Sequence, residues 1–201
     1  RAPMLFKALE HEAAKQVENF NSQTLANTAW AFARARYAAP SLFEKLAEKA
    51  ATSLAEFTAQ GLSIVAWAYA KVGHEAPVLF TALADEVAER VDEFKPQGLA
   101  IVAWAYAQAG HKATRLFQVL AEDAVWCVRD FRPEELKMMA RAFAMADHEA
   151  PWLLEAIREE VVEGDFEIDR RSLADIARTF AKSDEEIATL FNISALEATT
   201  S

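Results

Sequence analysis

The 201-residue sequence contains one cysteine, Cys127, five glycines and six prolines. A single cysteine excludes an internal disulfide and a cysteine zinc site, so we expect an intracellular or organellar protein. Glycine and proline interrupt helices, whereas alanine, which is abundant here, loses no side-chain entropy in a helix. The composition therefore predicts an all-α fold.

Long apolar runs are also absent. The longest, such as residues 99–107, have about nine residues, and a membrane-spanning helix needs about twenty. We therefore expect no membrane insertion. The sequence shows no signal peptide and opens in the middle of a repeat, so we expect any targeting segment to lie upstream.

Motifs for catalysis and metal binding are missing as well. The sequence has no glycine-rich phosphate loop, no serine nucleophile elbow and no cysteine–histidine pair with an orienting group. His74, His111 and His148 recur at one repeat position, but equivalent sites in packed helices lie about 10 Å apart, too far to share a metal ion. We interpret them as loop residues that cap helix ends. The sequence thus predicts no enzyme, no cofactor, no metal site and no small-molecule substrate.

The main positive feature is an internal repeat of 37 residues. The segment LANTAWAFARA at 25–35 recurs as LSIVAWAYAKV at 62–72 and LAIVAWAYAQA at 99–109. Self-similarity at a fixed period of this size is the signature of a repeat architecture. Two columns run through all five copies: Leu25, Leu62, Leu99, Leu136 and Leu173, and the aromatic column Phe32, Tyr69, Tyr106, Phe143 and Phe180.

Each unit contains two predicted helices. Helix A covers residues 22–35 in the first full copy, and helix B starts near a recurrent proline. Because such a pair cannot bury its apolar side alone, neighbouring units must stack, which predicts an α-α superhelix, or solenoid, of helix-turn-helix repeats. The predicted domain covers 1–191, with a half repeat at 1–21, repeats at 22–58, 59–95, 96–132 and 133–169, a truncated repeat at 170–191, and a polar tail at 192–201.

The predicted helix ends carry capping signals. The N-cap column is Asn21, Thr58, Lys95, Arg132 and Asp169, and three of these five side chains can accept a hydrogen bond from a free backbone N–H. Gly73 and Gly110 stand where a left-handed residue would end helix A.

One side of helix A should stay free of helix B and line a concave surface. With about 100° per residue, this side carries positions 23, 27 and 34 of the first copy, with position 30 at its margin. The polar candidates on it for RNA binding are Gln23, Asn27, Arg34, Gln60, Lys71, Gln97, Gln108, Arg141, Arg171, Arg178 and Lys182.

Position 30 has two open interpretations. It holds Trp30, Trp67 and Trp104, followed by Arg141 and Arg178. The rings could form a ladder on which bases or partner side chains stack. Alternatively, each ring packs over the neighbouring alanine column and joins one helix A to the next.

Charge is distributed unevenly. The formal net charge is −10, yet the five helix A segments sum to +4, the helix B segments and both ends to −15, and three junction residues to +1. The predicted outer wall is therefore acidic and the inner row mildly basic. The net charge alone would repel nucleic acid, but this asymmetry leaves an anionic ligand in the groove possible.

The unit resembles the heptatricopeptide and octotricopeptide repeats of organellar RNA-binding proteins, including proteins with RAP or FAST-kinase-like domains. The likeness covers 1–191 and is clearest in FKPQGL at 94–99 and AWAYA at 103–107. It implies binding of single-stranded RNA, a transcript or ribosomal RNA, in a mitochondrion or plastid, for RNA processing, translation or ribosome assembly. It also implies that helix A lines the RNA groove. The sequence departs from this pattern at Ile64, Ile101 and Met138, which stand where a base-reading polar residue is expected.

The sequence is thus compatible with two functions. The first is a non-enzymatic protein that binds single-stranded RNA in the concave helix A groove. The second is a protein–protein interaction scaffold or a subunit of a large organellar complex, which the apolar groove positions and the acidic outside favour.

Overall fold

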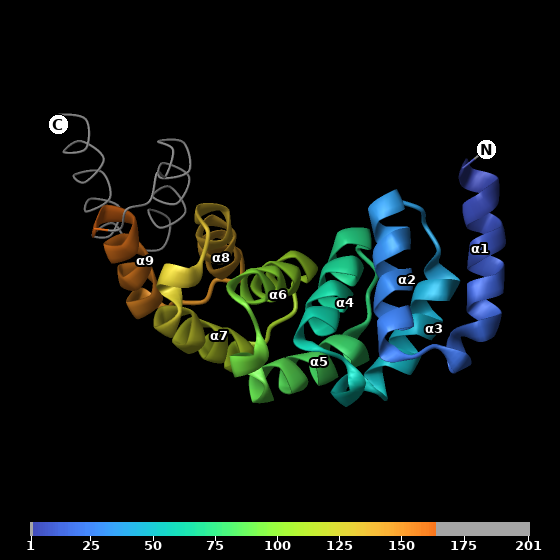
Figure 1. Cartoon of the computed structure of the whole chain (residues 1–201), viewed down its shortest axis with the longest axis horizontal. Helices are drawn as coiled ribbons and strands as arrows, with labels where there is room; N and C mark the ends of the chain where they lie inside the picture. The colour runs from blue at the N-terminus through green and yellow to red at the C-terminus, as the bar shows by residue number, and fades with distance from the viewer. Residues whose placement is uncertain (1, 164–201) are drawn as a thin grey trace.

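The computed structural model describes residues 2–163, and in this part of the chain it contains helices and no strands (Figure 1). The all-α prediction is thus confirmed. The α-helices are α1 Ala2–Gln16, α2 Ser22–Ala35, α3 Pro40–Ala51, α4 Ala59–Val72, α5 Pro77–Glu89, α6 Pro96–Ala109, α7 Thr114–Trp126, α8 Pro133–Met145 and α9 Pro151–Glu163. Short 3₁₀ turns follow four of them: η1 Val17–Asn19, η2 Leu54–Glu56, η3 Val91–Glu93 and η4 Val128–Asp130.

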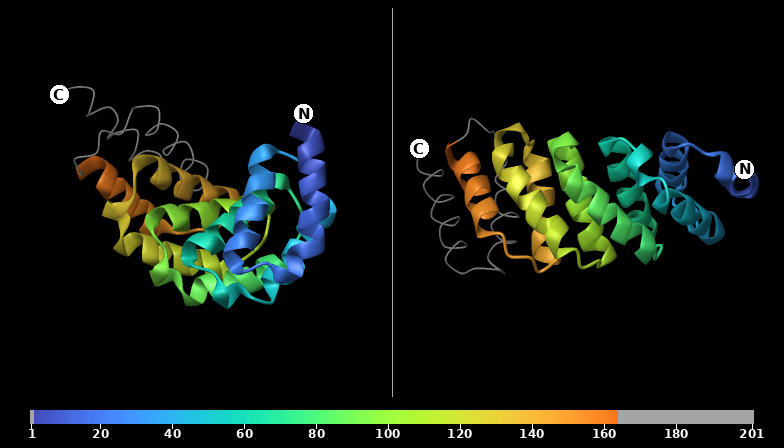
Figure 2. Two further views of the ribbon diagram at one scale, coloured as in Figure 1. Left: turned by 45° about the vertical axis from the view of Figure 1, so that its right-hand side comes forward. Right: turned by 90° about the horizontal axis from the view of Figure 1, so that it is seen from below.

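The helices form two curved rows, as predicted for a solenoid. The even-numbered helices α2, α4, α6 and α8 contact one another in sequence, and the odd-numbered helices do the same beside them (Figures 1 and 2). From α2 to α8 in the even row and from α3 to α9 in the odd row, each helix begins 37 residues after the one before it. The even row corresponds to helix A and lies on the concave side of the curve, as expected.

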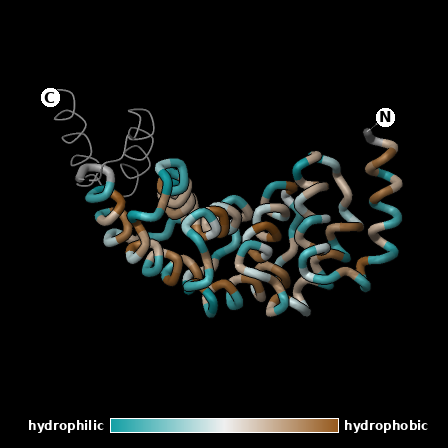
Figure 3. Tube along the Cα trace, in the orientation of Figure 1, coloured by the Kyte–Doolittle hydropathy of each residue, from teal (hydrophilic) through white to brown (hydrophobic). Residues whose placement is uncertain are grey.

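Small residues explain why the even row is the inner one. Ala68, Ala105 and Ala142 occupy one repeat position in α4, α6 and α8, and all three are fully buried. Small buried side chains let two helices approach closely, and consecutive even helices contact one another more extensively than consecutive odd helices do. Larger side chains fill the layer between the rows. Most helices carry both apolar and polar residues (Figure 3), whereas α4 and α6 are largely apolar.

Side-chain caps begin two of the even helices. The Asn21 side chain accepts a hydrogen bond from the backbone N–H of Thr24 at 2.8 Å, and the Thr58 hydroxyl accepts one from Gly61 at 3.1 Å. Both caps were predicted. In α6 and α8 a proline is the first helical residue and removes one free N–H instead. The third predicted cap, Asp169, lies outside the described residues.

Left-handed residues end the even helices. Gly73 and Gly110 have φ angles of 67° and 68°, as predicted for C-cap glycines. The same repeat position holds Arg36 and Asp147, which also adopt positive φ angles, of 54° and 51°. An L-residue with a side chain pays about 1–2 kcal/mol in this conformation, so these two repeats carry local backbone strain.

Replacing Arg36 by glycine should therefore raise the free energy of unfolding by about 0.5–1 kcal/mol, because relief of strain outweighs the greater freedom of the unfolded chain. Asp147→Gly should give a smaller gain, since aspartate tolerates the left-handed region better. Urea unfolding followed by circular dichroism measures both, and Gly73→Ala is the matched control, expected to lose about 1 kcal/mol. A destabilised Arg36→Gly variant would contradict the assignment.

The histidine column packs in a way that the sequence did not predict. The backbone N–H of His111 donates to the carbonyl of Tyr106 and helps to end α6, which agrees with the expected capping role. Its imidazole, however, stacks on the ring of Phe80, with centroids 4.4 Å apart and planes 12° apart. His74, His148 and Tyr37 make equivalent contacts with aromatic rings, so this column joins each repeat to the one before it.

This packing predicts a loss of stability in mild acid. Burial lowers the pKa of His111 and of His148, an effect that nearby Glu75 partly opposes at His111. The unfolded chain then binds more protons than the folded one below about pH 6.5, so the free energy of unfolding should fall as the pH drops through that value. His111→Tyr, which copies Tyr37, should reduce the slope between pH 7 and pH 5 in urea titrations. An unchanged slope would show that His111 does not contribute.

Candidate nucleic-acid interface

The concave face is built from one stripe on each even helix. Residues spaced i, i+4, i+7 and i+11 lie within one narrow sector of a helix. In α2 these are Gln23, Asn27, Trp30 and Arg34, and all four are exposed. The first repeat therefore presents a polar stripe with one aromatic ring to the groove.

The stripes of α4 and α6 differ from that of α2 at their centres. The first and last positions of these two stripes are exposed, as predicted, whereas Ile64 and Ile101 are half-buried, and Ile64 packs against the core. The exposed members are Gln60 and Lys71 of α4, and Gln97 and Gln108 of α6. The middle of the groove is thus apolar at its floor and polar at its two margins.

The stripe of α8 is the least polar one. Met138 is half-buried, Met145 is 43% exposed, and Arg141 is the exposed cation between them. Glu134 replaces the glutamine of the other three repeats at the start of the stripe. The groove therefore changes in character from α2, which is hydrophilic, to α8, which offers methionine.

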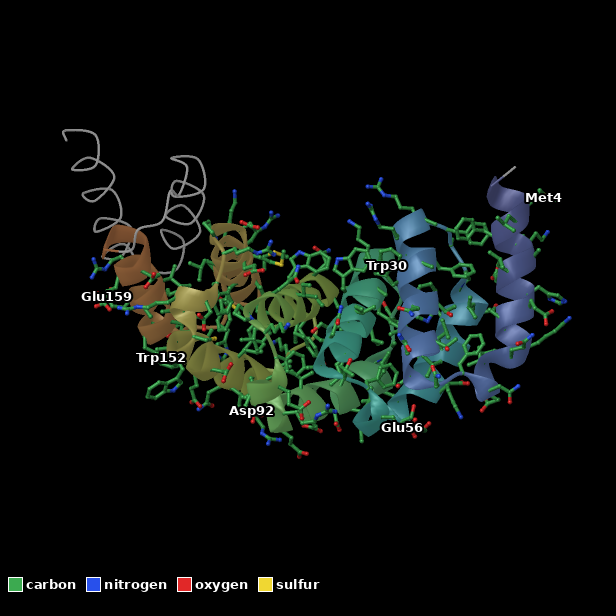
Figure 4. The ribbon with its side chains drawn as sticks, viewed as in Figure 1. Met4, Trp30, Glu56, Asp92, Trp152 and Glu159 are labelled. Carbon is green, nitrogen blue, oxygen red and sulfur yellow. The ribbon has the colours of Figure 1, made fainter. Side chains whose placement is uncertain are left out.

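The three tryptophans do not all fit the same interpretation. Trp30 is 46% exposed and lies at the concave edge between α2 and α4 (Figure 4). Trp67 and Trp104 are half-buried and pack against the core, which favours the packing interpretation for these two. A stacking role stays a prediction, and the exposure of Trp30 makes it the best placed of the three.

Three cations on the concave face are free. Within the part of the chain that the structure describes, Arg34, Lys71 and Arg141 are exposed and form neither an ion pair nor a side-chain hydrogen bond. Several cations of the outer row and its connections have acidic partners. These pairs are Lys49–Glu18 at 3.4 Å, Arg90–Glu86 at 2.8 Å, Arg90–Glu93 at 2.7 Å, Arg115–Asp85 at 3.7 Å and Arg129–Glu160 at 3.4 Å.

A hollow of about 530 Å³ opens between the N-terminal halves of α2 and α4. Gln23, Asn27 and Gln60 line it, with Ile64 and Phe57 as apolar neighbours. Among the described residues, these three amide side chains have no hydrogen-bond partner. Their donors and acceptors are available to a ligand, and each amide can both donate and accept.

A family model for the RNA-editing substrate-binding complex 6 protein matches residues 2–184, which include all of the described helices. The chain belongs to this family. No curated protein matches it. Membership in the RNA-editing substrate-binding complex 6 family confirms the coarser expectation of an RNA-associated helical protein. It does not bear on heptatricopeptide or octotricopeptide repeats, and that finer resemblance stays a proposal.

The described residues of this family member offer little reactive chemistry. Burial, with Asp123 and Asp130 nearby, raises the pKa of the Cys127 thiol to about 11, so the thiol stays protonated near neutral pH. No group of histidine, cysteine and acidic side chains within residues 2–163 is arranged to hold a metal ion. In the same range, no helix has the length and apolar character required to cross a bilayer.

Three candidate cations cannot be placed. Arg171, Arg178 and Lys182 lie outside the described residues, as do the truncated repeat 170–191 and the polar tail 192–201. Their assignments remain predictions.

Proposed function

We propose that this chain binds single-stranded RNA along the concave face of α2, α4, α6 and α8, as a non-enzymatic component of an RNA-editing complex. The observation that carries the proposal is the contrast between free and paired cations. Arg34, Lys71 and Arg141 keep their full hydrogen-bonding capacity, whereas several cations of the outer row and its connections, among them Lys49, Arg90 and Arg115, are engaged with carboxylates. Free cations on a concave face match the backbone of an RNA strand.

The acidic outer row does not prevent this binding. At physiological ionic strength, charges more than about 8 Å apart are largely screened from one another. Asp92, for example, lies at the edge of the molecule away from Trp30 (Figure 4), so a phosphate at the groove interacts mainly with nearer groups. The net charge of −10 thus weakens the nonspecific attraction of RNA to the protein, but it does not determine the electrostatic potential in the groove.

The repeat supports contacts that recur along the strand. In helical-repeat proteins that bind single-stranded RNA, each repeat contacts one base with two or three side chains. Here the stripes of α2, α4 and α6 each offer an amide near the start, and those of α2 and α4 offer a cation near the end. We infer that amides contact bases while Arg34 and Lys71 contact phosphates. The association of the family with RNA editing favours the mitochondrion over the plastid as the site of action.

The second candidate function is a protein scaffold, and α6 and α8 favour it. Ile101, Met138 and Met145 give this part of the groove an apolar character that RNA phosphates do not require. Methionine adapts its shape to many partners and is common at protein-binding surfaces. A protein segment bound over α6 and α8 is compatible with RNA over α2 and α4.

Equilibrium binding across a salt series tests the proposal. The purified chain is titrated against a fluorescently labelled single-stranded RNA of mixed sequence at 50–300 mM KCl. Each phosphate contact to a single strand contributes about −0.7 to the slope of log K against log salt, so three cations predict a slope of at least about −2. Absence of binding at 50 mM KCl, or a slope near zero, would favour the scaffold.

A further inference from the structure

The hollow between α2 and α4 combines three features that no other part of the described concave face combines. It has free amides from two helices, an exposed aromatic ring one turn away, and a free cation at the end of each stripe. Resting on the proposed function, we propose that this hollow is a base-specific subsite for adenine in single-stranded RNA.

The hydrogen bonds within the protein leave the amide side chains as the groups that can recognise a base. The Ser22 hydroxyl donates to the carbonyl of Glu56 at 2.9 Å, and the Thr58 hydroxyl is occupied by its capping bond. Both hydroxyls at the rim, and the side-chain oxygen of Asn21, thus already take part in hydrogen bonds of the fold. Gln23, Asn27 and Gln60 are the lining amide side chains that make no hydrogen bond within the described residues, so all of their donors and acceptors are available to a base.

The ring of Trp30 supplies a stacking surface at the right place. Trp30 follows Asn27 by three residues, which is about 4.5 Å along the helix axis, and leans toward α4 (Figure 4). A base stacked on this ring would direct one edge toward Asn27 and the hollow. Stacking on an aromatic side chain accepts any base, so the ring anchors the nucleotide and the amides provide selection.

The free cations fix the strand beside this base. Arg34 lies four residues, or about 6 Å, beyond Trp30 on the same stripe, and Lys71 occupies the equivalent position on α4. These two groups stand on the side of the ring opposite the hollow. A nucleotide can therefore place its base edge at the amides and a phosphate at the cations.

Adenine is the base that fits this arrangement best. In a single strand both edges of a base are exposed, and adenine offers its 6-amino donor beside an acceptor on each of them, N7 on one edge and N1 on the other, so a glutamine or asparagine amide can satisfy a donor and an acceptor at once whichever edge faces the hollow. Guanine matches an amide through its Watson–Crick edge alone, because its other edge presents two acceptors and requires two donors, as arginine provides. Among donor–acceptor bases, a purine also covers more of the Trp30 ring than cytosine or uracil does.

The other even helices lack this combination. In α4 and α6 the position of Asn27 is taken by Ile64 and Ile101, which cannot hydrogen-bond, and Trp67 and Trp104 are half-buried. In α8 the aromatic residue is replaced by Arg141. The inferred selection is thus confined to one nucleotide position of the strand.

The test compares three 12-nucleotide RNAs in the same uridine background. They carry at their centre two uridines, two adenosines, or two purine ribonucleosides without the 6-amino group. The adenosine strand should bind at least fivefold more tightly than the other two. Asn27→Ala should abolish this preference, whereas the matched amide variant Gln97→Ala should keep the preference. Trp30→Ala should weaken all three strands.

Two results would overturn the subsite, and they differ from failure of RNA binding itself. Equal affinity for the three strands would contradict adenine selection while the proposed function stands. A preference that survives Asn27→Ala but disappears in Gln97→Ala would place selection at another repeat. If none of the strands binds at low salt, the proposed function fails, and the subsite with it.

Discussion

Replacing Arg34 and Lys71 together by glutamate should lower the affinity for single-stranded RNA by about a hundredfold or more at low salt. Each charge-assisted hydrogen bond to a phosphate contributes about 1.5–3 kcal/mol, and tenfold in affinity corresponds to about 1.4 kcal/mol. The substitutions also place two repelling charges on the groove. Because neither side chain has a partner within the described structure, the melting temperature should change little. Fluorescence anisotropy with labelled RNA measures the affinity.

An equal change of charge on the outer row provides the control. Lys45→Glu with Arg115→Glu alters two exposed cations of α3 and α7 and adds the same negative charge to the molecule. If the groove binds RNA, this variant should lose less than about tenfold in affinity, through the general field alone. A control that binds as poorly as the groove variant would show that net charge, and not position, determines binding.

The largest expected loss of stability follows from replacing Tyr106 by alanine. Its side chain is fully buried, and its ring meets the ring of Phe80 edge-on with centroids 5.1 Å apart. Its hydroxyl donates to the carbonyl of Phe80 at 2.7 Å, so α6 is bonded to the preceding repeat. Removing a buried aromatic side chain costs about 3–5 kcal/mol, and we expect the free energy of unfolding to fall by that amount.

The conservative variant separates the ring from the hydroxyl. Tyr106→Phe keeps the ring and deletes one hydrogen bond, so it should cost about 1 kcal/mol. The same column holds Phe143 in α8, which shows that the position accepts phenylalanine. Urea unfolding of both variants checks the pair. A loss below 1 kcal/mol for Tyr106→Ala would mean that this contact does not join the repeats.

The fold could be predicted because its determinants are local and repeated. The columns of Leu25 and Phe32 carry the period, Asn21 and Thr58 mark helix starts, and Gly73 marks a helix end. The features that the sequence did not reveal are contacts between side chains of different repeats. Nothing in the local sequence indicates the stacking of His111 on Phe80, because the two rings belong to different repeats.

The candidate site could be predicted only in part. Helical geometry identified the stripe with Gln23, Asn27 and Arg34, and the structure places all three on the concave face. The sequence could not show that Trp30 is more exposed than Trp67. The residue one turn earlier does differ, since it is asparagine before Trp30 and isoleucine before Trp67. It also could not show which cations are free, since pairing depends on residues about 30 positions away, as between Lys49 and Glu18.

Mapping ultraviolet crosslinks tests the central claim, that RNA lies on the concave row, most directly. The chain is irradiated in complex with single-stranded RNA, and crosslinked peptides are identified by mass spectrometry. The outer row provides an internal comparison, because Trp126 is 90% exposed and Trp152 is 49% exposed on that side. We predict crosslinks in α2 and α4, with Trp30 among them. Crosslinks at Trp126 and Trp152 with none in α2 or α4 would contradict the claim.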